Sequence, residues 1–113
     1  MAVNCIFCKI VAGDIPAAIV KKSQHALAFD DINPQAPTHV LIIPTTHHDN
    51  VAELSAADPL ALQALFSLAA EIAAERGLNG YRTVFNTGAE AGQSVFHAHL
   101  HLLGGRALQW PPG

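Results

Sequence analysis

Three of the seven histidines in this 113-residue chain stand at positions 97, 99 and 101, separated from one another by single apolar residues. Side chains alternate between the two faces of a β-strand, so a strand over residues 95–103 would put all three imidazoles on one face, roughly 7 Å apart at the backbone. The opposite face would carry the apolar side chains of Phe96, Ala98, Leu100 and Leu102. Near pH 7 a neutral imidazole is a nucleophile, a proton carrier or a metal ligand. The alternation therefore predicts a chemical site lined by His97, His99 and His101.

A glycine-containing loop over residues 86–94 leads directly into this strand. Glycines such as Gly88 and Gly92 let the backbone approach an anion closely, and the N–H groups of a turn can point at phosphate oxygens. Many such loops are plain hairpin connections. Because this one precedes the histidines, we interpret it as a phosphate or oxyanion site.

Cys5 and Cys8 form a C-x-x-C pair near the start of the chain. Two thiolates at this spacing can both bind zinc, which then needs two further ligands in tetrahedral geometry. The alternatives are two buried thiols without a metal, or a redox pair, although no thioredoxin-like strand precedes the motif. Two cysteines do not form a disulfide framework, so we expect a reduced, cytoplasmic protein.

The elements that must position these groups follow from local patterns. Strands are expected over residues 18–22, 25–29, 38–43, 81–86 and 95–103, and a short helix over residues 5–12. Asp58 and Pro59 are a typical N-cap and first residue of a long helix, which Gly77 ends. The apolar stripe expected on that helix is Leu62, Leu65, Phe66, Ala69, Ile72 and Ala73. Antiparallel strands with two helices, and no repeated strand–helix–strand alternation, indicate an α+β domain.

The composition limits the classes of function. A chain of 113 residues that is 50% hydrophobic is one ordered domain, and a net charge of −3 without a basic stripe argues against nucleic-acid binding. Residues 1–14 lack the pattern of a signal peptide, and the uncharged helical stretch over residues 60–70 is too short to span a membrane. Only 13% of the residues are charged. We therefore expect apolar surface to be buried in a homodimer.

The segment His97–Leu103 reads H-φ-H-φ-H-φ-φ, where φ is apolar, and it resembles the signature of the histidine triad (HIT) family. The flanking segments Gly92–Phe96 and Gly104–Arg106, together with the terminal Trp110–Gly113, are similar to the Hint branch of that family. The resemblance extends from Cys5 to Gly113. It implies a single HIT domain over residues 1–113, with about five antiparallel strands, one long helix and one short helix.

The resemblance also implies a mechanism. Members of the family are nucleotide hydrolases and transferases that form a nucleotidyl–histidine intermediate on the middle histidine, here His99. An imidazole nitrogen attacks the α-phosphorus, and water then cleaves the reactive P–N bond. Ser94 and His101 would bind the phosphate or pass a proton to the leaving group, and His39 would orient and tune the nucleophile.

The residues that match the family's nucleotide contacts fall into three groups. Asp31 would accept hydrogen bonds from the ribose hydroxyls, with Ile32 beside it, unless Asp30-Asp31 is an ordinary turn. The phosphate-side contacts would be Asn86, Gly92, Gln93 and Ser94. The apolar walls of the nucleobase cleft would be Ile6, Phe7, Ile10 and Phe29. For these apolar residues, simple core packing is the alternative interpretation.

For the cysteine pair the resemblance implies a specific ligand set. Some bacterial members of the family combine the two cysteines with a histidine after a Pro-x-x sequence and with the first triad histidine, which here are His47 and His97. A Cys2His2 set has no open position, so the zinc would be structural. The alternative is two buried thiols with His47 on the surface, and His25 and His48 are expected there too. No organic cofactor is expected.

Three functions remain open. The first is a Hint-like hydrolase that cleaves the P–N bond of purine nucleoside 5′-phosphoramidates such as AMP-amine or AMP-lysine. The second is hydrolysis of dinucleoside polyphosphates, as in the Fhit branch. The third is a zinc- and nucleotide-binding module that recruits partners, with its metal on the cysteines or on the histidine strand. The ending Trp110–Gly113 favours the first, since in Hint dimers this tail reaches toward the neighbouring subunit's site, and Trp110 would act there on specificity.

Overall fold

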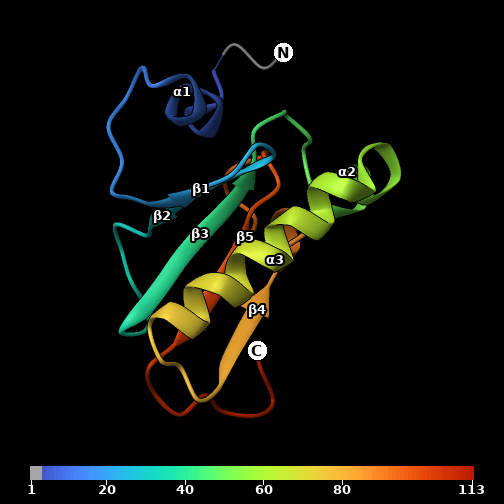
Figure 1. Cartoon of the computed structure of the whole chain (residues 1–113). Coiled ribbons are helices and arrows are strands. Elements are labelled where there is room, and N and C mark those ends of the chain that lie inside the picture. Colours follow the sequence, from blue (N-terminus) through green and yellow to red (C-terminus); the bar gives the residue numbers. More distant parts are fainter. Residues whose placement is uncertain (1–3) are drawn as a thin grey trace.

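A computed structural model describes residues 4–113, in which an antiparallel sheet of five strands lies between helices (Figure 1). Residues 1–3, part of the segment searched for a signal peptide, lie outside the described residues. The sheet has the order β1-β2-β3-β5-β4, formed by β1 (Ile19–Lys22), β2 (Ala26–Asp30), β3 (Thr38–Pro44), β5 (Leu100–Gly104) and β4 (Tyr81–Val84). The α+β class expected from the sequence is confirmed.

The long helix α3 (Pro59–Glu75) begins as its sequence predicts. The Asp58 carboxylate accepts a hydrogen bond from the Ala61 N–H at 3.2 Å, and Pro59 occupies the first turn. At the other end Gly77 has a φ of 64°, which an L side chain rarely adopts. The local signals therefore set both ends of α3.

The apolar stripe of α3 is rotated relative to the expected one. Leu68 is buried, whereas Phe66 is 45% exposed and packs edge-on against Phe85 with a centroid distance of 6.0 Å. The buried positions are Ala61, Leu65, Leu68, Ala69, Ile72 and Ala73. Both stripes fit a helical period, and only the position of the sheet selects the face that is buried.

A further helix, α2 (Val51–Ala57), was not expected from the sequence. Asn50 caps it, because its side-chain oxygen accepts a hydrogen bond from the Glu53 N–H at 2.9 Å. Leu54 is the one buried residue of α2. A helix of two turns with one buried position shows no apolar period, so the pattern could not reveal it. The expectation of two helices is corrected to three, together with the short 3-10 helix η1 (Ala89–Ala91).

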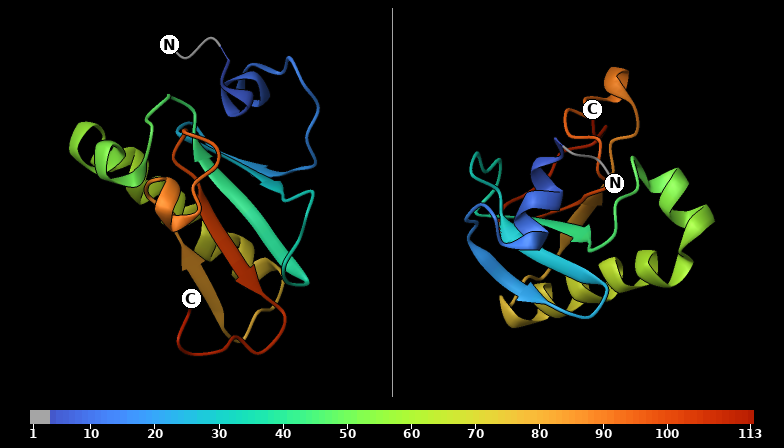
Figure 2. Two further views of the ribbon diagram at one scale, coloured as in Figure 1. Left: turned by 180° about the vertical axis from the view of Figure 1, so that it is seen from behind. Right: turned by 90° about the horizontal axis from the view of Figure 1, so that it is seen from above.

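The two faces of the sheet carry separate clusters of buried side chains. On one face, Val40 and Ile42 of β3 pack with Leu65 and Ile72 of α3. On the other, Leu27, Phe29, Leu41 and Ile43 pack with Cys5 and Phe7, at the start of the short helix α1 (Ile6–Ala12). Figure 2 shows α1 and α3 on opposite sides of the sheet.

The histidine strand is shorter than predicted. β5 begins at Leu100, and residues 95–97 form a bend instead of a strand. Phe96, expected in the core, is 49% exposed, whereas His97, expected on the open face, is fully buried. The predicted alternation is found only where the chain pairs with β3. That pairing begins at Leu100, opposite Ile42, so the residues before Leu100 are not constrained to alternate. No helix in residues 4–113 is both long and apolar enough to cross a membrane.

Candidate active site and metal centre

His99 is held with one ring nitrogen bonded and the other free. Its Nδ1 lies 2.8 Å from the main-chain oxygen of His97. A carbonyl oxygen can only accept, so the proton of neutral His99 is on Nδ1 and the lone pair is on Nε2. Burial lowers the pKa of His99 below its usual value, against the opposing effects of the His97 carbonyl and the Asp31 carboxylate. At pH 7 the Nε2 of His99 is therefore a neutral nucleophile.

His101 is held in the opposite way by a chain of hydrogen bonds. The Gln35 N–H donates to His39 Nδ1 at 3.0 Å, so the proton of neutral His39 is on Nε2. That nitrogen lies 2.9 Å from His101 Nδ1, which must then accept. The proton of His101 is left on Nε2. In the described part of the chain, this Nε2 is a buried nitrogen without a hydrogen-bond partner.

An unpartnered buried donor is costly, and a ligand that accepts its hydrogen bond removes the cost. Burial, together with the neighbouring imidazoles of His99 and His39, lowers the pKa of His101 to about 4. The ring is thus neutral at pH 7 and offers one N–H. The centroids of His99 and His101 are 5.0 Å apart, so a nucleophile and a hydrogen-bond donor lie side by side.

His39 is bonded to His101 and not directly to the nucleophile. The resemblance implies that His39 orients and tunes His99, whereas in the structure its Nε2 contacts His101, and His99 has the His97 carbonyl as partner. His39 Nε2 also lies 3.4 Å from a carboxylate oxygen of Asp31. The reason for the difference is register, because β3 pairs Leu41 with His101 and His39 is two residues away on the same face.

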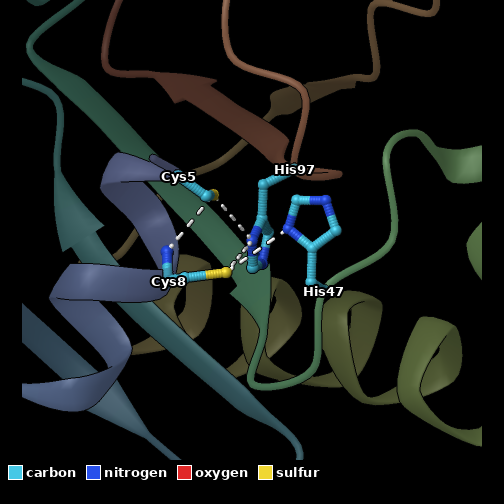
Figure 3. A group of neighbouring side chains, drawn as sticks. All are labelled: Cys5, Cys8, His47 and His97. Atoms are coloured by element: carbon cyan, nitrogen blue, oxygen red, sulfur yellow. Dashed lines mark hydrogen bonds between the residues drawn. The ribbon is translucent and has the colours of Figure 1, made fainter. Parts of the chain in front are cut away.

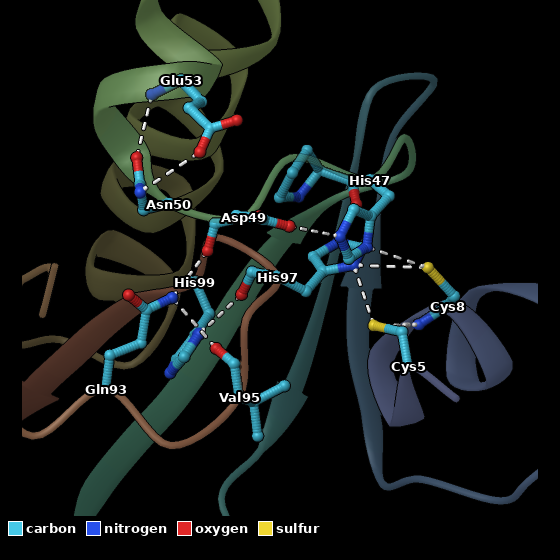
Figure 4. Close-up of polar contacts among 11 residues, drawn as sticks. Cys5, Cys8, His47, Asp49, Asn50, Glu53, Gln93, Val95, His97 and His99 are labelled. Carbon is cyan, nitrogen blue, oxygen red and sulfur yellow. Dashed lines mark hydrogen bonds and ion pairs between the residues drawn. The ribbon is translucent and has the colours of Figure 1, made fainter. Parts of the chain in front are cut away.

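The loop before the histidines is held by Gln93. The Gln93 side-chain amide donates to the main-chain oxygens of Asp49 at 2.6 Å and Val95 at 3.1 Å (Figure 4). Its oxygen accepts from the Gly88 N–H at 2.8 Å. Gly88 and Gly92 have φ values of 89° and 95°, so this loop needs glycine at both positions. The amide of Gln93, expected near phosphate, is bonded to the protein's own backbone.

The other expected nucleotide contacts are distributed unevenly. Phe7 is buried and packs edge-on against His99, with a centroid distance of 5.1 Å, and against Phe29 at 5.5 Å. Ile6 and Ile32 are exposed, and Ile10 and Asn86 are half-buried. Asp31 lies beside His39 and accepts a hydrogen bond from the Asn33 N–H at 2.8 Å.

Ser94 and Trp110 are exposed side chains that form none of the hydrogen bonds described above for His39, His99 and His101. Ser94 is exposed and lines a surface cavity of about 380 Å³ together with Cys5, Ile6, His47 and Asp49. Trp110 is 80% exposed on the C-terminal tail. The tail folds back beside β4, where Arg82 donates to the Gln109 carbonyl at 2.9 Å. In this chain the tail lies at the end of the sheet far from α1 (Figure 1).

The structure brings the four expected metal ligands together (Figure 3). One ligand atom from each of Cys5, Cys8, His47 and His97 lies within 4.8 Å of all the others. His97 Nδ1 is 3.4 Å from the Cys5 sulfur and 3.5 Å from the Cys8 sulfur, and His47 Nδ1 is 3.3 Å from the Cys8 sulfur. We call these four residues the Cys2His2 cluster.

The cluster fits a tetrahedral zinc ion. Zinc bonds to sulfur and nitrogen place neighbouring ligand atoms about 3.4–3.8 Å apart, close to the distances found here. His97 Nε2 donates to the Pro44 carbonyl at 2.9 Å and His47 Nε2 donates to the Asp49 carboxylate at 2.8 Å, so both Nδ1 lone pairs face the sulfurs. Burial, with the neighbouring Cys5, raises the pKa of Cys8 to about 11. A thiol with so high a pKa is a poor redox group, because the thiolate is the reactive form. A thiolate at this position therefore needs a neighbouring cation.

A second group of potential ligands consists of Asp31, His39 and His101. The His39 Nε2 and His101 Nδ1 atoms are 2.9 Å apart, and the Gln35 N–H fixes a proton between them. This geometry is that of a hydrogen bond, and it favours the cysteine-containing cluster as the metal centre. Sequence reasoning missed Gln35, Pro44 and Asp49, which act through backbone or carboxylate atoms and carry no motif.

Comparisons with known proteins place the chain in one family. The sequence matches the HIT domain family over residues 12–108. A purine nucleoside phosphoramidase of Escherichia coli strain K12 is 46% identical over 110 residues, covering 96% of this chain and 92% of the relative. A 14 kDa zinc-binding protein of Zea mays is 47% identical over 112 residues, covering 96% of this chain and 87% of the relative.

Solved structures give the same result. A HIT family hydrolase from Legionella pneumophila superposes with a TM-score of 0.93 at 49% identity, covering 97% of this chain and 100% of that one. A HIT family hydrolase from Clostridium thermocellum superposes with a TM-score of 0.91 at 41% identity, covering 96% of each chain. The expected resemblance is thereby confirmed, and the chain belongs to the histidine triad family.

Proposed function

We propose that the protein is a phosphoramidase that hydrolyses the P–N bond of purine nucleoside 5′-phosphoramidates such as AMP-amine or AMP-lysine. The observation that carries this proposal is the pair of neighbouring imidazoles, in which His99 offers a free Nε2 lone pair and His101 offers an unpartnered N–H. A phosphoryl group suits both, because its phosphorus is electrophilic and its oxygens accept hydrogen bonds. The phosphoramidase of E. coli, similar over 96% of this chain, supports the choice of substrate.

The reaction follows from the two tautomers. The lone pair of His99 Nε2 attacks the α-phosphorus while the P–N bond to the leaving amine breaks, and the nucleotide becomes bonded to His99. His101 Nε2–H binds a phosphate oxygen, whose negative charge raises the pKa of that ring. Water then attacks phosphorus and loses a proton to solvent, the bond to Nε2 breaks with its electron pair returning to nitrogen, and AMP is released.

The leaving nitrogen must gain a proton as its bond to phosphorus breaks. His101 carries a single proton, and it needs that proton to bind the phosphate. We therefore assign the leaving-group proton to solvent, relayed through the exposed hydroxyl of Ser94. The Asp31 carboxylate lies 3.4 Å from His39 Nε2, and we assign it to accept hydrogen bonds from the ribose hydroxyls.

The Cys2His2 cluster is proposed to hold one structural zinc ion. Cys5, Cys8, His47 and His97 would complete its tetrahedral shell, so no position stays open for substrate or water. The zinc-binding relative from Zea mays supports this assignment. The two free cysteines suit the reducing cytoplasm that the sequence predicts.

The protein is proposed to act as a homodimer. β4 is an edge strand whose outer side is unpaired in residues 4–113, and Phe66 and Tyr81 near it are each 45% exposed. Pairing of two β4 strands would bury these side chains and bring the exposed Trp110 of one subunit toward the other. Deleting Trp110–Gly113 should then change the ratio of activities among leaving groups more than the stability. A monomeric mass by light scattering at micromolar concentration would contradict the dimer.

The substrate assignment is tested by comparing adenosine 5′-phosphoramidate with diadenosine tetraphosphate in one preparation. We expect kcat/KM for the phosphoramidate to be at least about tenfold higher. The reverse order would favour a dinucleoside polyphosphate hydrolase. Samples quenched with alkaline denaturant, which preserves the acid-labile P–N bond, should contain AMP bonded to His99, detected by peptide mass spectrometry and absent in His99→Ala. Binding of AMP without turnover of either substrate would favour a binding module that recruits partners.

A further inference from the structure

His97 takes part in both sites through different atoms. Its imidazole belongs to the Cys2His2 cluster, where Nδ1 lies 3.4 Å from the Cys5 sulfur and Nε2 donates to the Pro44 carbonyl at 2.9 Å. Its main-chain oxygen accepts the Nδ1 proton of His99 at 2.8 Å. The hydrogen bond that leaves the His99 lone pair on Nε2 therefore comes from a residue whose side chain is a candidate metal ligand (Figure 4).

The sheet does not hold the His97 backbone in place. The pairing between β3 and β5 ends at Leu100, and residues 95–97 form a bend. Close to His97, the main-chain bond from the Ala98 N–H to the His48 carbonyl at 2.7 Å ties the bend to the segment that also carries His47. Main-chain and side-chain anchors of the bend thus converge on the Cys2His2 cluster.

Two further connections join the cluster to the nucleotide side. Phe7 lies between the two cysteines in sequence, and its ring packs against His99 at 5.1 Å and against His97 at 6.0 Å. The Asp49 carboxylate accepts from His47, while its main-chain oxygen accepts from the side chain of Gln93, which holds the glycine loop. Movement of the cluster would reach both the nucleophile and the loop.

We propose that His97 is a positioning residue through which metal loading of the Cys2His2 cluster orients the nucleophile. This inference rests on the proposed function, in which the cluster binds zinc and His99 attacks phosphorus. A bound cation holds the His97 imidazole and with it the bend at residues 95–97. The His97 carbonyl then keeps His99 in the single tautomer with its lone pair on Nε2. Without the cation the bend relaxes, and His99 samples both tautomers and other orientations.

The direct test is nuclear magnetic resonance of protein labelled with ¹⁵N in its histidine rings. Spectra of the zinc-loaded protein should show His99 protonated on Nδ1 alone. After chelation and removal of the metal at a temperature where the protein stays folded, His99 should show a mixture of tautomers. Adding Zn²⁺ back should restore the single form. This readout does not depend on turnover.

A matched pair of variants separates the cluster from other histidines. His47→Asn removes one ligand and leaves His97 and His99 unsubstituted, and it should reproduce the mixed His99 tautomer. It should also slow formation of the AMP–His99 adduct in single turnover by about tenfold, because small displacements of reacting groups cost this much or more. His25→Asn changes an exposed histidine outside the cluster and should leave both measurements as in the wild type.

The outcomes distinguish the inference from the proposed function. Identical His99 spectra and adduct rates with and without zinc overturn the positioning role, even if the protein melts earlier without metal, since that would be a purely structural effect. Protein that binds no zinc overturns it as well. Zinc-dependent His99 spectra in a protein that does not cleave phosphoramidates support the positioning role and overturn the phosphoramidase.

Discussion

The Cys2His2 cluster and the nucleophile His99 use the same side chain in opposite tautomers. In the cluster, His47 and His97 donate from Nε2 to the Asp49 carboxylate and the Pro44 carbonyl, which leaves Nδ1 free for a metal. In His99 the carbonyl contact is made by Nδ1, and Nε2 is free for phosphorus. The identity of the bonded nitrogen decides what each imidazole can do.

Burial alone does not separate the two regions. His97 and His99 are both buried, and burial is the largest cause of the lowered pKa of each. Their roles differ because an oxygen acceptor meets Nε2 in one ring and Nδ1 in the other. In a histidine-rich sequence, the chemical role of each imidazole can therefore be assigned only when the position of its hydrogen-bond acceptor is known.

The sharpest way to separate the two regions is to remove the nucleophile. His99→Ala should lower turnover of adenosine 5′-phosphoramidate by about 10⁴-fold or more, because the neighbouring His101 carries its proton on Nε2 and has no lone pair there for phosphorus. The variant should keep its zinc and still bind AMP, which metal analysis and calorimetry measure. If instead zinc is lost together with activity, the metal is centred on the histidine strand.

Removing a cysteine should have the complementary effect. Cys5→Ala should lose bound zinc and lower the free energy of unfolding by several kcal/mol, on the order of 3–5, because binding to the folded state stabilises it. Elemental analysis and thermal unfolding check this result. Wild-type protein prepared under reducing conditions with zinc in the medium should contain one zinc per chain, and a metal-free preparation would remove the zinc assignment.

The buried His101 should make folding sensitive to acid. The pKa of His101 falls from 6.5 to about 4 in the folded protein, mainly through burial. Below pH 6.5 the imidazole of His101 binds a proton in the unfolded chain, whereas in the folded chain it stays neutral down to about pH 4. This contribution to stability is therefore complete above pH 6.5 and is lost as the pH falls toward 4, by about 3 kcal/mol.

Comparing the wild type with His101→Asn isolates the contribution of His101 to the acid loss of stability. Acid also releases any bound metal, but it does so in both proteins, so that effect cancels in the comparison. Chemical denaturation at several pH values should give a shallower acid loss of stability in the variant. Parallel curves for the two proteins would show that His101 titrates normally in the folded state.

The smallest of these effects concerns the partner of His101. His39→Ala removes the donor to His101 Nδ1, so the ring can turn or change tautomer, and kcat should fall about 5- to 100-fold, the equivalent of one lost buried hydrogen bond. His39→Gln, which can still accept from the Gln35 N–H and donate to His101, should recover part of the rate. Equal loss in both variants would argue against a role in setting the tautomer.

Much of the fold was predictable because it depends on neighbours in sequence. The cap formed by Asp58 and Pro59, the left-handed Gly13 and Gly77, and the central strand ended by Pro44 all agree with the structure. The helix α2 was missed because it buries a single side chain, Leu54. Short elements that carry no period are stabilised by tertiary contacts, which local patterns do not contain.

The candidate site divides in the same way. The sequence by itself determined which side chains are available, namely the histidines at alternate positions, the cysteine pair and the glycines that the loop requires. Tertiary structure decided that β5 begins at Leu100, that His39 contacts His101, and which nitrogen of each ring is free. The physical reason is that a tautomer is set by its hydrogen-bond partner, and Pro44, the acceptor for His97, lies 53 residues away in the chain.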